Sequence, residues 1–177
     1  MTYDVVLADP PWAYTGQQDK WGAAAKFYPT MSNEDIFSFD MRSFMNDKSL
    51  LFMWITCPKL DIAVEALAKW GLYYRGVAFV WVKTKQDGTP VKAQGVRPSV
   101  VKPLTELVLV ASTIKTGRPL KLYDETICQT IFAPKQEHSR KPDEVHERIE
   151  RMYPFATKIE LFARRRRLGW DVWGNEV

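Results

Sequence analysis

The segment Tyr3-Asp4-Val5-Val6-Leu7-Ala8-Asp9-Pro10-Pro11-Trp12 decides the fold class, because in it an apolar strand runs directly into a rigid polar turn. Residues 3–8 are mostly apolar and β-branched, which is typical of a strand that is covered on both faces. Pro10 and Pro11 have no backbone N–H, so strand pairing must end at Asp9. Ligands of α/β proteins bind beyond the carboxyl ends of such strands. Asp9 is therefore expected at a binding edge.

Strands and helices are expected to alternate along the rest of the chain. Ser32, with an acid three residues later, predicts the start of a short helix, and Pro58 predicts a second, amphipathic helix that ends before Gly71. A third helix is expected over residues 142–153. Apolar runs predict strands over residues 50–55, 76–83, 106–111, 128–132, 158–163 and 170–173. This pattern predicts one three-layer α/β/α domain over residues 1–177, with a mostly parallel sheet.

The composition is that of an ordinary globular protein. The 177 residues are 46% hydrophobic and 26% charged, which is enough for one buried core. Lys and Arg outnumber Asp and Glu by 25 to 21, an excess that suits a polyanionic partner but is too common to identify one. Cys57 and Cys128 form neither a metal-ligand pair nor a disulfide framework. With no apolar run of membrane-span length and no leader pattern, we expect a soluble cytoplasmic protein that does not enter a membrane.

The turn Asp9-Pro10-Pro11-Trp12 has the groups to receive a planar amine. The Asp9 carboxylate and the Pro10 carbonyl could accept the two N–H bonds of an exocyclic amino group, and the Trp12 ring could stack on the base. Asp-Pro and Pro-Pro also occur in ordinary turns, so these four residues alone leave both interpretations open.

Ordered motifs over nearly the whole chain resemble those of one family. After residues 9–12 come Tyr28-Pro29-Thr30-Met31-Ser32, Leu51-Phe52-Met53-Trp54-Ile55-Thr56, Trp81-Val82-Lys83-Thr84, Glu106-Leu107-Val108-Leu109-Val110, His138-Ser139-Arg140-Lys141-Pro142-Asp143-Glu144, Lys158-Ile159-Glu160-Leu161-Phe162-Ala163-Arg164 and Gly169-Trp170-Asp171-Val172-Trp173-Gly174-Asn175-Glu176. Their order is similar to that of the MT-A70 family, the adenine N6-methyltransferases with the permuted, beta-type motif order. This resemblance implies a Rossmann-like methyltransferase domain that uses S-adenosylmethionine and no metal.

The resemblance also implies a role for each matching residue. The catalytic residues would be Asp9, Pro10, Pro11 and Trp12; the cofactor would contact Asp9, Lys141, Arg164, Arg166, Arg167, Asn175 and Glu176; and the substrate would contact Trp12, Tyr28 and Lys83. Independently of the resemblance, a stretch of small and polar residues without periodicity predicts a lid over residues 13–27, and a polar stretch between two expected strands predicts a substrate loop over residues 84–103. The resemblance places the cofactor-binding part in residues 138–177.

Several of these roles have a simpler alternative. Lys141 could be an exposed residue before a helix, and Asn175 and Glu176 lie where chains commonly fray. The turn after residue 163 departs from the family pattern, since four arginines replace a stretch that contains histidine and asparagine in the eukaryotic mRNA enzyme. Runs of arginine are usually solvated or bind phosphate, so at least two of the four are expected not to contact the cofactor.

The expected substrate is adenine in nucleic acid, with DNA slightly favoured over RNA, and either a homodimer or a heterodimer with a related subunit is compatible with the sequence. The alternative is a catalytically inactive nucleic-acid-binding subunit. A covalent cytosine mechanism is unsupported because Cys57 precedes a proline instead of following one. Zinc-deaminase and phosphate-loop motifs are absent. His138 and His146 have no metal-type companions and are expected in a loop and on a helix surface.

Overall fold

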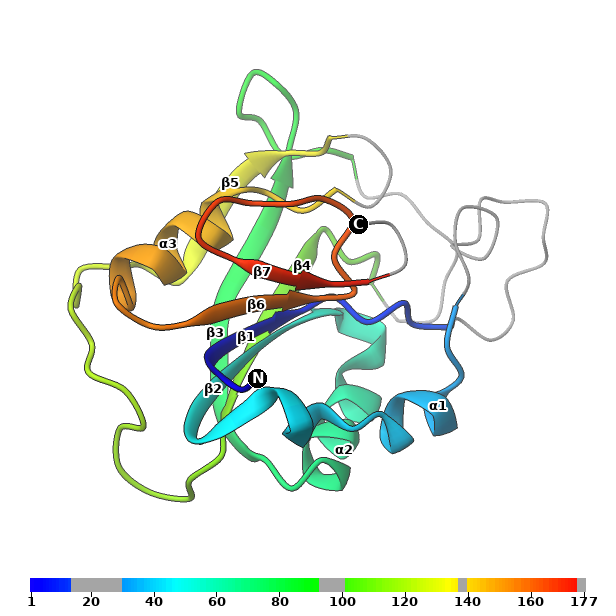
Figure 1. The fold of residues 1–177 in the computed structure, drawn as a ribbon. Helices are drawn as coiled ribbons and strands as arrows, with labels where there is room; N and C mark the ends of the chain where they lie inside the picture. The colour runs from blue at the N-terminus through cyan, green and yellow to red at the C-terminus, as the bar shows by residue number, and fades with distance from the viewer. Residues whose placement is uncertain (14–29, 93–100, 137–139, 175–177) are drawn as a thin grey trace.

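The computed structural model describes residues 1–13, 30–92, 101–136 and 140–174, and contains one seven-stranded sheet with helices on both faces (Figure 1). The strands are β1 (Tyr3–Ala8), β2 (Met45–Thr56), β3 (Tyr73–Thr84), β4 (Thr105–Ser112), β5 (Thr130–Pro134), β6 (Lys158–Leu161) and β7 (Asp171–Trp173). The helices are α1 (Asn33–Ser38), α2 (Leu60–Lys69) and α3 (Glu144–Met152), with short 3-10 turns η3 (Met41–Phe44) and η4 (Cys57–Lys59). The expected α/β class is confirmed.

The sheet has the order β5-β3-β4-β2-β1-β6-β7, and β1 lies near its centre. β1 is parallel to β2 and to β6, β6 is parallel to β7, and β3 is parallel to β5. β4 is antiparallel to both of its neighbours, β2 and β3. The expectation of a mostly parallel sheet therefore needs a correction at β4, whose amino end lies at the edge where the other strands have their carboxyl ends.

Alternate residues of the central strands pack on opposite faces, as the period of two in a strand requires. Val6, Leu51 and Met53 pack with residues of α1 and α2, whereas Val5 and Phe52 pack with residues of α3. Figure 1 shows α1 and α2 on one side of the sheet and α3 on the other. Because both faces of β1 and β2 are covered, these strands read as continuous apolar runs in the sequence.

Local sequence signals explain where the elements begin and end. Ser32 caps α1 by accepting a hydrogen bond from the Asp35 backbone N–H at 3.1 Å, and the Asp35 carboxylate accepts one from the Ser32 N–H at 3.2 Å, which is the predicted capping box. β6 ends two residues before the predicted boundary because Phe162 has a φ of 59°. That left-handed conformation is incompatible with a strand. Among the described residues, no helix combines the length and apolar character that crossing a membrane requires.

Candidate functional site

Asp9 directly follows β1 at the carboxyl edge of the sheet, between the carboxyl ends of β2 and β6. Its backbone N–H donates to the Leu161 carbonyl at 3.4 Å, which extends the pairing of β1 with β6 by one residue. The position of Asp9 is therefore fixed by a strand that is hydrogen-bonded on both sides.

Hydrogen bonds within the turn make residues 9–12 rigid. The Trp12 N–H donates to the Pro10 carbonyl at 2.8 Å, which closes a three-residue turn around Pro11. The Pro11 carbonyl accepts the Met31 N–H at 2.9 Å, and the Ala13 N–H donates to the Met31 carbonyl at 3.2 Å. A carbonyl oxygen has two lone pairs, so Pro10 keeps one acceptor position for a ligand.

The structure buries Trp12 instead of presenting its ring as an open floor. Its side chain is only 5% exposed, and its indole N–H donates to the Trp54 carbonyl at 3.3 Å. The ring thus anchors the turn of residues 9–12 to β2. Stacking of Trp12 on a base stays a prediction, and it would require part of the ring to be uncovered.

An alternating chain of four charged side chains extends from Asp9 along the same edge. The Lys141 ammonium lies 3.0 Å from Oδ2 of Asp9 and 3.3 Å from Oε2 of Glu106. The other oxygen of Glu106, Oε1, lies 2.6 Å from the Lys83 ammonium. Lys141 comes from the loop between β5 and α3, and Lys83 from the end of β3. The ammonium of a lysine has three N–H donors, so Lys141 retains one for a further acceptor.

Glu106 also belongs to this cluster, although it is not among the site residues predicted from the sequence. It lies opposite Thr56 of β2 and Trp81 of β3, because the reversed strand β4 starts where those strands end. Within a run of apolar residues, Glu106 looked like the polar boundary of a core strand. No local pattern in the sequence marks it, because only the antiparallel pairing of β4 brings Glu106 to face Lys83 and Lys141.

Burial and ion pairing set the charge states of the cluster. Burial raises the pKa of Asp9 above its usual range, and the Lys141 ammonium offsets part of that rise. Burial would also raise the pKa of Glu106, but Lys141 and Lys83 outweigh it and leave that pKa lowered. Burial would lower the pKa of Lys141, but the carboxylates of Asp9 and Glu106 outweigh it and leave that pKa raised. Lys141 is therefore a permanent cation beside Asp9.

Two tryptophan rings support the two lysines. The Lys141 ammonium lies 5.5 Å from the centre of the Trp54 ring, and the Lys83 ammonium lies 5.1 Å from that of Trp81. The two rings contact each other edge to face, with centres 6.1 Å apart. Such rings attract cations through their faces, which limits the positions that the ammonium groups can take.

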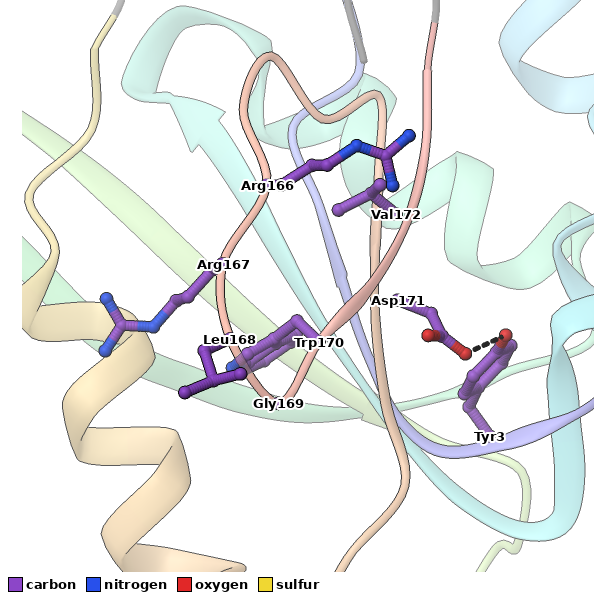
Figure 2. Close-up of a pocket in the computed structure, with 8 residues that line it drawn as sticks. All are labelled: Tyr3, Arg166, Arg167, Leu168, Gly169, Trp170, Asp171 and Val172. Carbon is purple, nitrogen blue, oxygen red and sulfur yellow. Dashed lines mark hydrogen bonds between the residues drawn. The ribbon is translucent and has the colours of Figure 1, made fainter.

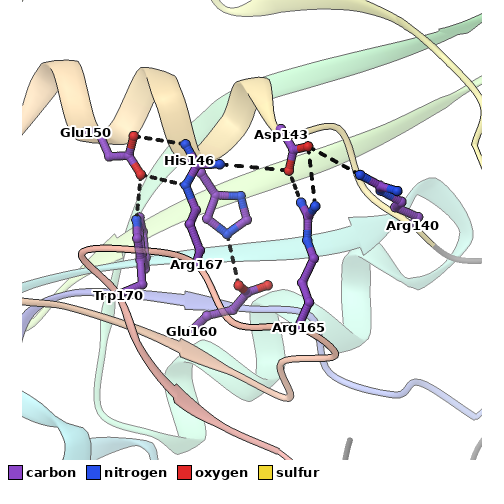
Figure 3. A network of polar contacts seen from close by, with 8 residues as sticks. All are labelled: Arg140, Asp143, His146, Glu150, Glu160, Arg165, Arg167 and Trp170. Atoms are coloured by element: carbon purple, nitrogen blue, oxygen red, sulfur yellow. Dashed lines mark hydrogen bonds and ion pairs between the residues drawn. The ribbon is translucent and has the colours of Figure 1, made fainter. Parts of the chain in front are cut away.

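The arginine turn is fastened to α3 by ion pairs (Figure 3). Arg167 forms two hydrogen bonds with the carboxylate of Glu150, at 2.7 and 3.0 Å, and that carboxylate also accepts the Trp170 indole N–H at 2.8 Å. Arg165 pairs with Asp143, which also faces Arg140 at 3.6 Å. Arg165 and Arg167 are thus both engaged by acids, and a cofactor contact of Arg167 stays a prediction.

Arg166 and Arg164 lie in different surroundings. Arg166 lines a hollow of about 570 Å³ together with Tyr3 and Asp171, whose side chains are hydrogen-bonded at 2.7 Å (Figure 2). Tyr3 begins β1 and Asp171 begins β7, so this hollow extends toward the edge opposite Asp9. The positive charge of Arg164, in contrast, opposes the rise that burial causes in the pKa of Asp9. Of the three predicted arginines, Arg164 is the one that acts electrostatically on Asp9.

The sequence predicted His146 on the surface of a helix, but the structure buries it between α3 and the sheet. It is 4% exposed, its Nε2 lies 2.9 Å from Oε2 of Glu160, and its ring contacts Trp170 edge to face (Figure 3). The amphipathic pattern of α3 did not reveal this because histidine is common on both buried and exposed helix faces. His146 helps to attach α3 to β6.

Gly174, the last residue that the structure describes, packs closely against the backbone of Phe162 and Ala163, which follow β6. A Cβ at this position would lie 2.5 Å from the Ala163 carbonyl oxygen, and the Ala163 N–H donates to the Trp173 carbonyl at 3.1 Å. Only glycine permits this approach. The predicted site residues Tyr28, Asn175 and Glu176 lie outside the described residues, as do His138, most of the predicted lid and residues 93–100 of the predicted substrate loop.

Comparison with known proteins finds relatives along the whole chain. The sequence model of a family described as MT-A70 matches residues 3–176. The type II methyltransferase M.MunI of a Mycoplasma species is 34% identical, with 99% of this chain and 78% of the relative aligned. An MT-A70-like N(6)-adenosine-methyltransferase of Arabidopsis thaliana is 33% identical, and the human N(6)-adenosine-methyltransferase catalytic subunit METTL3 is 30% identical. Each match to these two covers 99% of this chain but only 24% and 28% of the relative.

Proposed function

The chain belongs to the MT-A70 family, and from this premise we propose that it transfers a methyl group from S-adenosylmethionine to the exocyclic amine of adenine in nucleic acid. The observation that carries the proposal is the position of Asp9 at the carboxyl edge, ion-paired with Lys141 and followed by the rigid Pro10-Pro11 turn. For the fold, we propose the three-layer Rossmann-like arrangement of methyltransferases. A dimer and a cytoplasmic location stay predictions.

The residues present suit the cofactor that this reaction needs. S-adenosylmethionine supplies an electrophilic methyl group on a sulfonium, together with an amino-acid carboxylate and a ribose. The third N–H of Lys141 is available to that carboxylate. Asn175 and Glu176 follow Gly174 directly in the sequence, and an amide and an acid are suitable partners for ribose hydroxyls.

The catalytic turn would act on the substrate by orientation and charge. Oδ1 of Asp9 and the Pro10 carbonyl can accept the two amine N–H bonds, which raises the electron density on the adenine nitrogen and aims its lone pair. When the N–C bond forms and the S–C bond breaks, the nitrogen must lose a proton. Burial raises the pKa of Asp9, so its carboxylate is suited to receive that proton before releasing it to water.

As the polymer we propose DNA. The relative that is matched over most of its length is named a type II methyltransferase, whereas the relatives named adenosine methyltransferases are matched over about a quarter of theirs. A duplex substrate would have to present the adenine outside the base stack, because the target amine of a paired adenine is enclosed within the duplex.

The test is a methyl-transfer assay with labelled S-adenosylmethionine and four oligonucleotides, namely single- and double-stranded DNA and RNA of one adenine-containing sequence. We expect N6-methyladenine in DNA, identified by mass spectrometry of the nucleosides. Oligonucleotides with hypoxanthine in place of adenine are the control, since they lack the amine. If the cofactor binds but no adenine in any polymer is methylated, the proposed activity is wrong.

A further inference from the structure

A hollow of about 370 Å³ at the carboxyl edge of the sheet is lined mainly by lysines. Its lining consists of Lys83, Lys85, Val91, Lys92, Pro103, Leu104 and Lys135, and contains no acid. Lys83 lies near the carboxyl end of β3, and Lys85 directly follows that strand. Lys135 directly follows β5, and Pro103 and Leu104 precede β4. The hollow therefore opens at the same edge as Asp9.

Backbone hydrogen bonds hold the walls of the hollow together. The Lys83 N–H donates to the Leu104 carbonyl at 3.2 Å, and the Val91 N–H donates to the Lys83 carbonyl at 3.1 Å. The Lys135 N–H donates to the carbonyl of the buried Thr84 at 3.1 Å. Four separate stretches of chain are thus fixed against one another, and the lysines they carry are brought together by the fold.

The positive charge of this hollow is mostly uncompensated. Glu106 neutralises Lys83, but within the part of the chain that the structure describes no carboxylate forms an ion pair with Lys85, Lys92 or Lys135, all three of which are exposed. Asp87, the acid of the same hairpin, is engaged by the N–H and O–H of Thr89 at 2.9 and 2.6 Å. A concave surface with clustered cations concentrates anions, and above all polyanions.

We propose that this lysine hollow binds the phosphate backbone of the nucleic acid next to the target adenine. The inference rests on the proposed function and adds to it the place where the strand is held. Lys83, Glu106, Lys141 and Asp9 are joined by consecutive ion pairs, so the hollow lies a short distance along the edge from the catalytic carboxylate. If the target base lies at Asp9, the phosphate backbone attached to that base lies along the same edge. Lysine ammonium groups bind phosphate as point charges, so the hollow contributes affinity and register but no base preference.

The test measures how salt affects binding of a short fluorescein-labelled single-stranded DNA with one central adenine. The triple variant Lys85→Gln, Lys92→Gln, Lys135→Gln removes the three exposed charges. Each phosphate contact contributes about 0.7 to the slope of log K against log salt for a single strand, so we expect the slope between about 50 and 200 mM salt to fall by about 2. Neutral methylphosphonate linkages beside the adenine should weaken binding to the natural protein and leave the triple variant nearly unaffected.

The matched control is the triple variant Lys48→Gln, Lys69→Gln, Lys115→Gln, which loses the same charge from exposed lysines at the opposite edge of the sheet. If both variants lower the slope equally, or if the methylphosphonate effect persists in the hollow variant, the inference is wrong. These results are separable from the proposed function. If the natural protein methylates adenine but the hollow variant binds DNA like the control variant, only the inference about the hollow is wrong. If the natural protein methylates no adenine, the proposed activity is wrong, whatever the binding slopes show.

Discussion

The ammonium nitrogen of Lys141 lies 3.0 Å from a carboxylate oxygen of Asp9 and 3.3 Å from one of Glu106, so a single cation joins the end of β1 to the start of β4. Burial makes an ionised Asp9 costly, and Lys141 offsets part of that cost. The arrangement keeps a negative charge at the point where a positive charge would develop on the substrate amine. Its consequences can be measured in both activity and stability.

Asp9→Asn should separate these two properties. The amide keeps the shape but loses the charge, so we expect kcat to fall by about 100- to 1,000-fold. The folded-state pKa of Asp9 is raised, so its ionised form destabilises the fold at neutral pH and its removal should leave Tm unchanged or higher. Single-turnover methyl transfer and thermal unfolding measure the two effects. Near-normal turnover of the Asn variant on an established substrate would contradict the mechanism.

The pH profile should report the pKa of Asp9. The proposed mechanism requires the ionised carboxylate of Asp9, so the acidic limb of kcat should lie above the ordinary aspartate value of about 3.9. Lys141→Gln removes the cation that lowers this pKa, and we therefore expect the limb to move to higher pH. Lys141→Arg keeps the charge and should move it less. Identical limbs in all three proteins would show that Asp9 is not the group that titrates.

Glu106→Gln should weaken the fold in a pH-dependent way. The folded-state pKa of Glu106 is lowered, so its charge stabilises the protein above its unfolded value of about 4.3, and this contribution is lost as the pH falls through the folded value. Glu106 is 12% exposed and partners two lysines, so we expect a loss of about 3 kcal/mol at pH 7 and a smaller loss in acid. Urea unfolding at both pH values measures this.

The control for Glu106 is Glu125→Gln. Glu125 forms an ion pair with Arg118 at 3.2 Å, and both side chains are largely exposed. Such surface pairs contribute at most about 1 kcal/mol, and that contribution is screened by salt. Equal losses in the two variants would mean that the buried cluster is no more important to stability than a surface pair.

The sequence predicted what depends on local pattern. The strand before Asp9, the capping box at Ser32 and the apolar stripe of α3 are all visible in consecutive residues, and the structure confirms these elements. It did not predict the reversal of β4, because parallel and antiparallel core strands have the same apolar pattern. Glu106 was missed for that reason. The partners of Arg165 and Arg167 could not be predicted either, since Asp143 directly precedes α3 and Glu150 lies on it, both far from the arginines in sequence.

Arg167→Gln should lower stability and leave the cofactor affinity unchanged. Arg167 is bound through two nitrogens to Glu150, which lowers the pKa of Glu150, and both side chains are partly exposed. Allowing for screening by solvent, we expect a loss of about 1 kcal/mol, most of which should disappear in a Glu150→Gln background. Calorimetry with S-adenosylhomocysteine measures the affinity. A large loss of affinity at unchanged stability would restore Arg167 to the cofactor site.

Gly174→Ala should affect the cofactor more than the rest of the fold. The added methyl group would lie 2.5 Å from the Ala163 carbonyl oxygen, so the backbone at residue 174 must move away from Ala163. Overpacking of this kind costs about 1 to 3 kcal/mol, and β7 is a short edge strand that can separate locally from β6. Because Asn175 and Glu176 follow directly, we expect S-adenosylhomocysteine to bind at least tenfold more weakly. Gly117→Ala provides the comparison: Gly117 also has a demanding backbone, with a φ of 77°, but lies at the other edge of the sheet. If both variants bind the cofactor equally well, residues 174–176 do not form part of its site.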